Sequence, residues 1–261
     1  MLPHLFTIGG YSQSTYGLMV ALAFVAALTL TGKLAQRAGL SQENVLNLGM
    51  YCALAGIVGA KLLMFTHIAS LADVFTMDTL RAGGDFFGGL ILALIVAAIY
   101  MRRKHLPPLA TADVFAPGLA LGHAIGRVGC FAAGCCYGVR TSLPWAVTFT
   151  SPDANGAPLN VPIHPTQLYE SLAEALIFGI LYWRIRKPHP PGAIIGLYLM
   201  LYGLVRFLVE FVRFHEQGNI GPFDASQWIA LALIGLGAAC LANVRKSKPG
   251  GVPAAPAPAA R

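Results

Sequence analysis

Thirteen residues at the end of an apolar segment, GRVGCFAAGCCYG at positions 126–138, combine one arginine with four glycines. An arginine at the edge of a hydrocarbon layer is costly, so Arg127 should face protein, water or an anion rather than lipid tails. Glycines let the backbone bend and bring its N–H groups close to a ligand. The segment therefore predicts either a phosphate-binding loop at membrane depth or a glycine-rich packing motif whose arginine reaches the interface.

A second set of polar residues lies in a later apolar segment. Tyr202, Arg206, Glu210 and Arg213 are spaced four, four and three residues apart and so share one helical face. A self-neutralising pair of Arg206 and Glu210 would be purely structural. However, the apolar segments hold several ionisable residues: Lys61, Asp113, Arg127, Glu170, Glu174, Arg206 and Glu210. Charges within a membrane indicate function by default, and paired arginines suit bidentate phosphate binding, so we predict a functional polar cavity.

The segment HPTQLYE at 164–170 leads into another apolar stretch. Thr166 is placed to cap a helix there, which would be a structural role. His164 and Glu170 are also side chains that can move a proton near neutral pH. Both interpretations stay open from the sequence alone.

The elements that must position these residues are membrane helices. Hydrophobic residues make up 56% of the 261 residues and charged residues 11%, and the mean hydropathy is +0.64, which excludes an ordinary soluble domain. The first basic residue is Lys33, so the N-terminus lacks the positive region of a cleaved signal peptide. We expect an all-α integral membrane protein with about seven transmembrane helices. The expected spans are 15–32, 47–68, 86–101, 109–129, 167–183, 193–212 and 227–244.

Basic residues divide unequally between the two sides of this arrangement. Twelve lie in alternate connections and in the tail, whereas the opposite side has only Arg81, Arg140 and Arg213. The asymmetry predicts an N-terminus outside and a C-terminus in the cytoplasm. The net charge of +7 is therefore a topology signal, and no basic run with interleaved aromatics suggests nucleic acid as a partner.

One membrane domain accounts for residues 1–245. Its longest outer connection, residues 139–165, alternates in polarity at 145–149 and is expected to form a small strand or hairpin outside the membrane. The tail at 246–261 is rich in proline, alanine and glycine, so we expect it to be disordered.

Five cysteines are present. Cys52 and Cys240 sit in apolar segments and are expected to pack there. Cys130, Cys135 and Cys136 cluster near the expected outer face, where an oxidising compartment permits a disulfide. Their spacing matches neither a CxxC redox motif nor a zinc pattern with a nearby histidine, so we expect no metal site. A membrane thiol–disulfide oxidoreductase that uses these three cysteines stays open as an alternative function.

Four segments in this order resemble the prolipoprotein diacylglyceryl transferase family. They are YGLM at 16–19, the glycine-rich segment at 126–138, HPTQLYE at 164–170 and YGLVRFLVEFVR at 202–213. The resemblance covers about residues 16–243 and implies a bacterial inner-membrane enzyme. Such an enzyme transfers a diacylglyceryl group from phosphatidylglycerol to the lipobox cysteine thiol of prolipoproteins. Its partners would be phosphatidylglycerol, prolipoprotein signal peptides and membrane lipids, without a cofactor or metal.

The resemblance also implies roles for particular residues. The family's signature opens with Gly-Arg and closes on a glycine, and its second essential arginine has a glutamate companion one turn later. On this match the expected catalytic residues are Arg127, Arg206, Glu210 and Tyr16. The expected substrate-binding residues are Arg127, Gly138, Arg206, His164 and Glu170. Fixed arginines would stabilise the charge that develops on a phosphate leaving group.

Three positions depart from the family's pattern. Phe87 stands where a catalytic histidine is usual, Cys130 replaces an asparagine and Cys135 replaces a glutamate. The proton acceptor for the substrate thiol therefore stays open between His164, Glu210 and water aided by the positive field of the arginines. A non-catalytic lipid-binding relative is a further alternative.

Overall fold

The described part of the chain consists of seven long helices and two small hairpins. The computed structural model describes residues 4–8, 11–66, 84–214 and 220–246. The helices are α1 (Thr15–Arg37), α2 (Gln42–Phe65), α5 (Phe86–Arg103), α6 (Pro108–Ala133), α7 (Thr166–Ile185), α8 (Ala193–Glu210) and α9 (Ala225–Lys246). The antiparallel hairpins pair β1 (His4–Ile8) with β2 (Tyr11–Ser14), and β3 (Val147–Thr148) with β4 (Pro162–Ile163).

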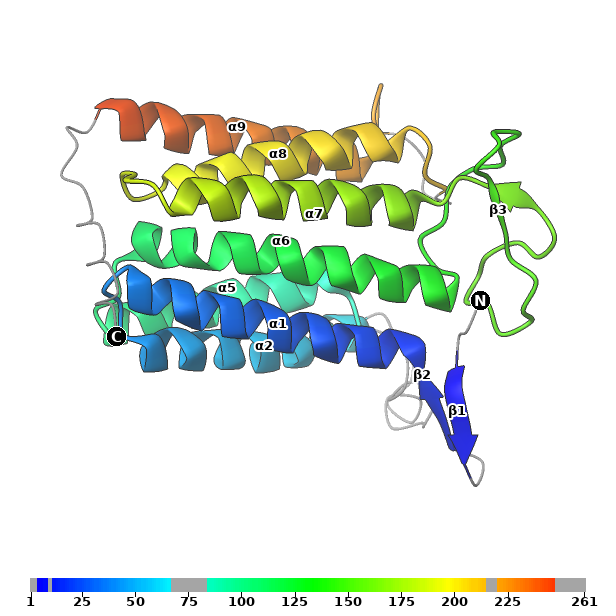
Figure 1. The fold of residues 1–261 in the computed structure, drawn as a ribbon, viewed down its shortest axis with the longest axis horizontal. Coiled ribbons are helices and arrows are strands. Elements are labelled where there is room, and N and C mark those ends of the chain that lie inside the picture. Colours follow the sequence, from blue (N-terminus) through cyan, green and yellow to red (C-terminus); the bar gives the residue numbers. More distant parts are fainter. Residues whose placement is uncertain (1–3, 9–10, 67–83, 215–219, 247–261) are drawn as a thin grey trace, which may run out of the picture.

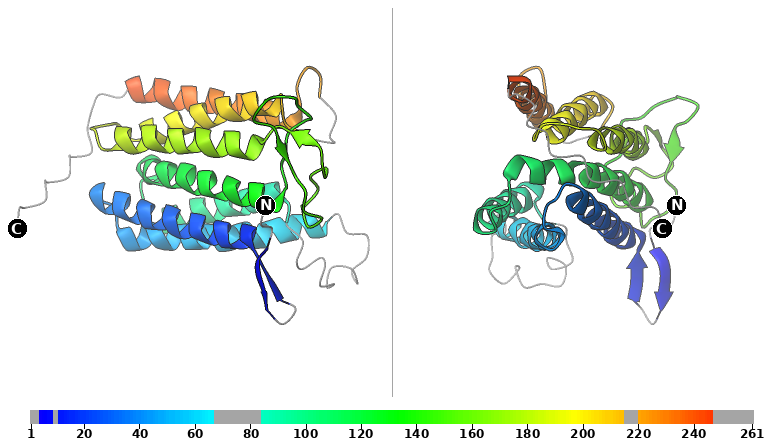
Figure 2. Two further views of the ribbon diagram at one scale, coloured as in Figure 1. Left: turned by 45° about the vertical axis from the view of Figure 1, so that its right-hand side comes forward. Right: turned by 60° about the vertical axis from the view of Figure 1, so that its left-hand side comes forward.

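The helices run alongside one another, and α6 lies in the middle (Figure 1). On one side α6 packs against α1, which in turn contacts α2, and α2 packs against α5. On the other side α6 contacts α7 and α8, and α8 packs against α9. The two groups of three helices on either side of α6 are visible in the two views of Figure 2. Because α6 ends in the glycine-rich segment, the fold places this segment between the two groups.

Each of the seven expected spans falls on one helix, and the expected all-α fold is confirmed. The second expected span ended at Ile68, and its last two residues lie outside the described residues. Six of the seven helices are long and apolar enough to cross a membrane. The chain is therefore a multi-pass membrane protein.

Helix α7 is the described helix that is not apolar enough by this measure, and the burial of its residues gives the reason. Glu170 and Glu174, one turn apart, are 2% and 1% exposed, whereas Leu172 and Leu176 on the other face are 65% and 62% exposed. The polar face thus points into the protein, where charged groups find partners, and the apolar face points outward. The mean hydropathy of the helix does not distinguish its two faces, so it does not report this separation.

Close helix contacts on the α2 side depend on glycine. A Cβ atom on Gly59 of α2 would overlap the carbonyl oxygen of Gly88 on α5, and a Cβ atom on Gly88 would overlap that of Gly59. Small residues of this kind let helix backbones approach each other in a membrane. The α1–α2–α5 group is accordingly held mainly by apolar packing.

The connection between α6 and α7 forms a small folded unit at the end of the bundle where α6 ends (Figure 1). Phe149 and Ile163, each 1% exposed, pack with Ala157 in its centre. The strand expected within residues 145–149 is confirmed by β3, although it is only two residues long. The sequence did not predict the β1–β2 hairpin, which lies at the same end of the bundle (Figure 1). The tail expected to be disordered, apart from Lys246, lies outside the described residues.

Candidate active site

Glu170 is the centre of a buried cluster of charges. The Nη2 atom of Arg127 on α6 lies 2.6 Å from its Oε2 atom. The Nη1 atoms of Arg206 on α8 and of Arg213, just beyond α8, lie 3.4 Å and 2.8 Å from its Oε1 atom. Helix α6 and the segment of α8 with the residues directly after it therefore bring three guanidinium groups to one carboxylate.

Arg206 is held by a second carboxylate as well. Its Nη1 atom lies 3.0 Å from Oε2 of Glu210, and its Nη2 atom donates to Oε1 of Glu210 at 3.2 Å. Nη2 also lies 3.3 Å from the hydroxyl oxygen of Ser226 on α9. The pairing of Arg206 and Glu210 that their spacing of four predicted is thus present. Both oxygens of Glu210 are engaged with Arg206, so this glutamate orients the guanidinium group.

His123 holds Arg127 in a similar way. The Nε atom of Arg127 donates to Nε2 of His123 at 3.1 Å, and Nδ1 of His123 lies 3.4 Å from Oε1 of Glu174. The histidine therefore links the arginine to a second buried carboxylate on α7. Sequence analysis did not assign His123 to the site, although its spacing of four from Arg127 on one helix was a usable signal.

The cluster can bind an anion. Three guanidinium groups face the carboxylates of Glu170 and Glu210, and His123 links a third buried carboxylate, Glu174, to Arg127. Guanidinium forks match the oxygen geometry of a phosphate, and their attraction is stronger in a partly buried site than in water. Arg213 was noted on the face of Arg206 but was not among the expected site residues.

Tyr16 lies beside the glycine-rich segment. It is in the first turn of α1 and is 43% exposed. A Cβ atom on Gly129 of α6 would lie 3.4 Å from the Cδ2 atom of Tyr16 and 2.9 Å from the Cβ atom of Met19. The absence of a side chain at Gly129 therefore lets α1 approach the end of α6, close to Arg127.

Gly138 occupies a crossing of three segments. A Cβ atom there would lie 2.5 Å from both the Cβ atom of His164 and the carbonyl oxygen of Val212. Its N–H donates to the carbonyl oxygen of His164 at 3.0 Å, and it forms a β-bridge with Arg213. The backbone of Gly138 thus helps to fix the segment that carries Arg213.

His164 and Phe87 bear on the open question of the proton acceptor. Nδ1 of His164 lies 3.2 Å from the hydroxyl oxygen of Tyr169, which accepts a hydrogen bond from the indole of Trp145 at 2.8 Å. Phe87 lies in the first turn of α5, is half exposed, and belongs to a helix that packs against α2. Among the described residues, neither His164 nor Phe87 is paired with Glu170.

Asp113 has a structural role. It is 1% exposed, and its carboxylate accepts hydrogen bonds from the backbone N–H groups of Gly192, Ile194 and Ile195 at 2.7, 3.0 and 2.8 Å. These groups form the N-terminus of α8, where N–H groups lack partners within the helix and attract negative charge. Asp113 therefore caps α8 from α6, and its charge needs no ligand to explain it.

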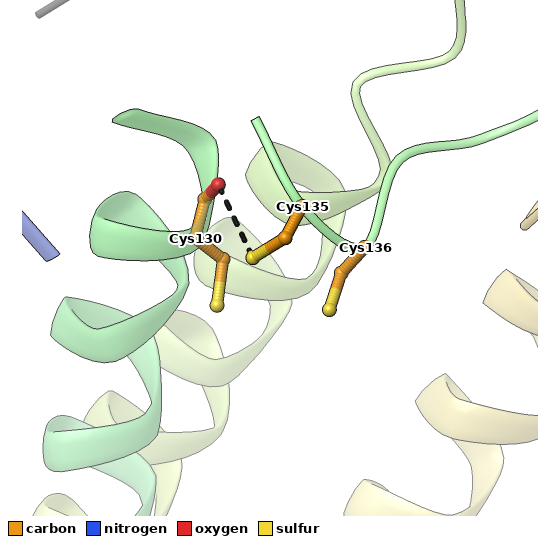
Figure 3. Close-up of side chains that lie close together, drawn as sticks. All are labelled: Cys130, Cys135 and Cys136. Atoms are coloured by element: carbon orange, nitrogen blue, oxygen red, sulfur yellow. Dashed lines mark hydrogen bonds between the residues drawn. The ribbon is translucent and has the colours of Figure 1, made fainter. Parts of the chain in front are cut away.

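The three clustered cysteines also meet in space. Their sulfur atoms all lie within 4.8 Å of one another, and all three thiols are free (Figure 3). The thiols of Cys130 and Cys135, followed by the guanidinium groups of Arg213 and Arg127, lower the pKa of the Cys136 thiol. Contacts with the other two thiols, and burial, raise the pKa of the Cys135 thiol. The sulfur atom of Cys135 lies 3.7 Å from the carbonyl oxygen of Cys130.

Comparison with known proteins agrees with the resemblance in the four segments. Residues 3–243 match the prolipoprotein diacylglyceryl transferase family. A phosphatidylglycerol–prolipoprotein diacylglyceryl transferase of Clostridium tetani is 36% identical over 239 residues, which are 91% of this chain and 95% of that protein. The corresponding protein of Geobacter sulfurreducens is 34% identical over 259 residues, 95% of this chain and 97% of its own.

A third relative is similar over a somewhat smaller part of the chain. The protein of the same name from Vibrio vulnificus is 37% identical over 228 residues, 85% of this chain and 82% of its own. The oxidoreductase alternative gains no support from these relatives. The family match and the near full-length similarity lead to one conclusion: this chain belongs to the prolipoprotein diacylglyceryl transferase family.

Proposed function

We propose that this protein transfers a diacylglyceryl group from phosphatidylglycerol to the lipobox cysteine thiol of prolipoproteins. The observation that carries the proposal is the meeting of Arg127, Arg206 and Arg213 at Glu170, between helices of a membrane bundle. The relatives' names give the reaction, and the cluster supplies what its phosphate-containing donor requires. Both substrates reach such a site from the membrane.

The chemistry places a defined demand on the site. The sulfur of the acceptor forms a bond to the terminal glyceryl carbon, and the bond between this carbon and a phosphate oxygen breaks. The oxygen keeps the electron pair, so glycerol phosphate leaves with added negative charge, and the thiol loses its proton. Fixed donors that meet this charge lower the barrier. Arg127 and Arg206 are the donors that we assign to the phosphate.

The remaining residues position these arginines. Glu210 and Glu170 hold Arg206, while His123 and Glu170 hold Arg127. Gly138 acts through the backbone that it shares with the Arg213 segment. Tyr16 borders the site from α1 and is exposed enough to meet a lipid.

The hydrogen-bond and ion-pair partners of His164 and Glu210 help to choose between the candidate proton acceptors. Both oxygens of Glu210 face Arg206, so this carboxylate serves to hold the guanidinium group. His164 is paired with Tyr169. A free thiol has a pKa near 8.5, and nearby cations raise its thiolate fraction. We therefore assign activation of the thiol to the field of the arginines, with water as the proton acceptor.

The same proposal includes the inner membrane and an outer location for the cluster. The basic connections 104–107 and 186–192 lie at the end of the bundle opposite to the 134–165 connection (Figure 1). The positive-inside rule then places residues 134–165 outside. A reporter that is active only outside the cytoplasm should give no signal when fused after residue 250. A strong signal from this fusion would contradict the orientation.

A lipidation assay with purified protein tests the function. The protein is incubated with a lipobox peptide in liposomes that contain either phosphatidylglycerol or only phosphatidylcholine, and the peptide mass is measured. We expect a thioether-linked diacylglyceryl adduct only with phosphatidylglycerol, and none when the peptide cysteine is replaced by serine. A correctly folded protein that produces no adduct would contradict the proposal.

A further inference from the structure

We propose that Cys130, Cys135 and Cys136 form a binding site for a thiophilic d¹⁰ metal ion, and that the ion is Zn²⁺. The site adjoins the proposed transfer site at Arg127, but its test does not depend on the transfer reaction. Thiolates are the preferred ligands of such cations in proteins. The three sulfur atoms converge from the end of α6 and from the turn that follows it (Figure 3).

The distances suit a single ion. Zinc–sulfur bonds of about 2.3 Å at tetrahedral angles place the sulfur atoms about 3.8 Å apart. The three Sγ atoms lie within 4.8 Å of one another, so side-chain movements of about 1 Å or less are needed to bind one ion. Three protein ligands leave the fourth position for water or an added thiol, as in zinc sites with an exchangeable ligand.

The backbone presents the sulfur atoms at some conformational cost. Helix α6 ends at Gly134 with φ at 76°, and Cys136, which has a side chain, also adopts a left-handed φ of 60°. A non-glycine residue in this region is strained and persists where its surroundings hold it. The left-handed turns at these two positions bring Cys135 and Cys136 back to Cys130.

Helix α7 supplies those surroundings. The side-chain amide of Gln167 donates to the carbonyl oxygen of Cys135 at 2.7 Å, and the hydroxyl of Thr166 donates to that of Cys136 at 2.8 Å. Both donors are fully buried. The turn is therefore fixed before any ion binds, which reduces the entropic cost of ordering the ligands on binding.

Charge balance also favours a cation held by three thiolates. Three thiolates and one Zn²⁺ carry a net charge of −1, which needs a positive neighbour in a partly buried site. The Nη1 atom of Arg127 lies 4.0 Å from Sγ of Cys130. A guanidinium group of the arginine cluster is thus adjacent to the site.

Metal binding to variants of the purified protein tests this proposal. The double variant Cys52→Ser/Cys240→Ser keeps only the three clustered cysteines and is the reference. Protein purified without oxygen and reduced is dialysed against Zn²⁺, and the bound metal is counted. We expect one Zn²⁺ per chain in the wild type and in the reference, and charge-transfer bands of sulfur ligation when Co²⁺ is substituted.

Single Cys→Ser changes at positions 130, 135 and 136 in the reference background complete the test. Each should weaken Zn²⁺ binding by more than the roughly 10- to 100-fold that loss of an outer hydrogen-bond partner costs. Thermal unfolding of each metal-free variant shows that it is folded. Binding well below one ion per chain in the reference would overturn the proposal. So would undiminished affinity in all three serine variants, or a disulfide that joins two of the three cysteines in protein isolated without oxygen.

Discussion

Two buried carboxylates near opposite ends of α6 show how differently a membrane protein can accommodate a charge. Asp113 is 1% exposed and Glu170 is 2% exposed, so burial alone does not distinguish them. Asp113 accepts from three backbone N–H groups at the start of α8. Glu170 is met instead by three long arginine side chains.

The kind of partner decides what each site can do. Backbone N–H groups at a helix end are fixed, so those around Asp113 form a closed site that serves the fold. Arginine side chains can turn, and their several donors can be shared between Glu170 and another anion. The comparison shows that a buried carboxylate indicates ligand binding when several mobile cationic side chains surround it and their donors can also reach a second anion.

The largest effect is expected for Glu170→Gln. This change leaves three partly buried guanidinium groups without their common buried carboxylate, and breaking a buried ion pair costs about 3–5 kcal/mol. We expect a loss of stability of this size, measured by thermal unfolding in detergent. Added phosphatidylglycerol should restore part of it, since its phosphate can replace the lost charge. A variant that gains no stability from phosphatidylglycerol would show that the arginines do not accept an external anion.

Arg127→Lys and Arg206→Lys test the arginine cluster around Glu170 through the rate of diacylglyceryl transfer. Each keeps the charge but loses the guanidinium fork, and loss of one stabilising donor commonly costs about 10²–10³ in rate. We expect each variant to slow diacylglyceryl transfer by about this factor in the peptide assay. Arg140→Lys, an exposed arginine of the outer connection, is the matched control and should transfer normally. Normal rates in both cluster variants would make these arginines structural.

Asp113→Asn should lower the stability of the fold without lowering the rate of transfer. An amide can accept fewer of the three N–H bonds, and an unsatisfied buried group costs about 1–3 kcal/mol. We expect a lower unfolding temperature that phosphatidylglycerol restores no more than it stabilises the wild type. The transfer rate per folded molecule should be unchanged. A large fall in this rate without a loss of stability would remove the distinction between the two carboxylates.

Gly138→Ala is expected to act on the arginine cluster from outside. The added methyl group would press against His164 and the carbonyl oxygen of Val212, and overpacking of this kind costs about 1–3 kcal/mol. The shift should reach Arg213, so transfer should fall together with stability. Gly179→Ala on α7 is the control for an added methyl group without overpacking, because a Cβ there would meet nothing within 4 Å and, as at Gly138, the backbone is not left-handed. A stable Gly138→Ala variant with normal transfer would exclude this role.

The sequence predicted the helices well because membrane spans depend on length and apolar composition. It also predicted the pair of Arg206 and Glu210, since both lie on one helix at a fixed spacing. The three-arginine arrangement was harder to predict, because Arg127, Glu170 and Arg213 come from separate elements that only the packing of α6, α7 and α8 brings together. The cap made by Asp113 depends on the same packing.

The cysteines show the limit most clearly. A spacing of five between Cys130 and Cys135 along a regular helix would not have indicated a shared site. The left-handed residues Gly134 and Cys136 reverse the chain, and no simple spacing rule describes that turn. His123 is a different case: its spacing of four from Arg127 was a usable signal, but its contact with Glu174 depends on the packing of α6 against α7.

Binding of phosphatidylglycerol tests the central claim most directly. Native mass spectrometry can compare the retention of phosphatidylglycerol and of phosphatidylcholine with the same acyl chains. The wild type and Asp113→Asn should both retain phosphatidylglycerol preferentially, whereas Arg127→Gln/Arg206→Gln, which removes two positive charges, should lose this preference. An unchanged preference in the folded double variant would contradict the assignment of the phosphate to the arginine cluster around Glu170.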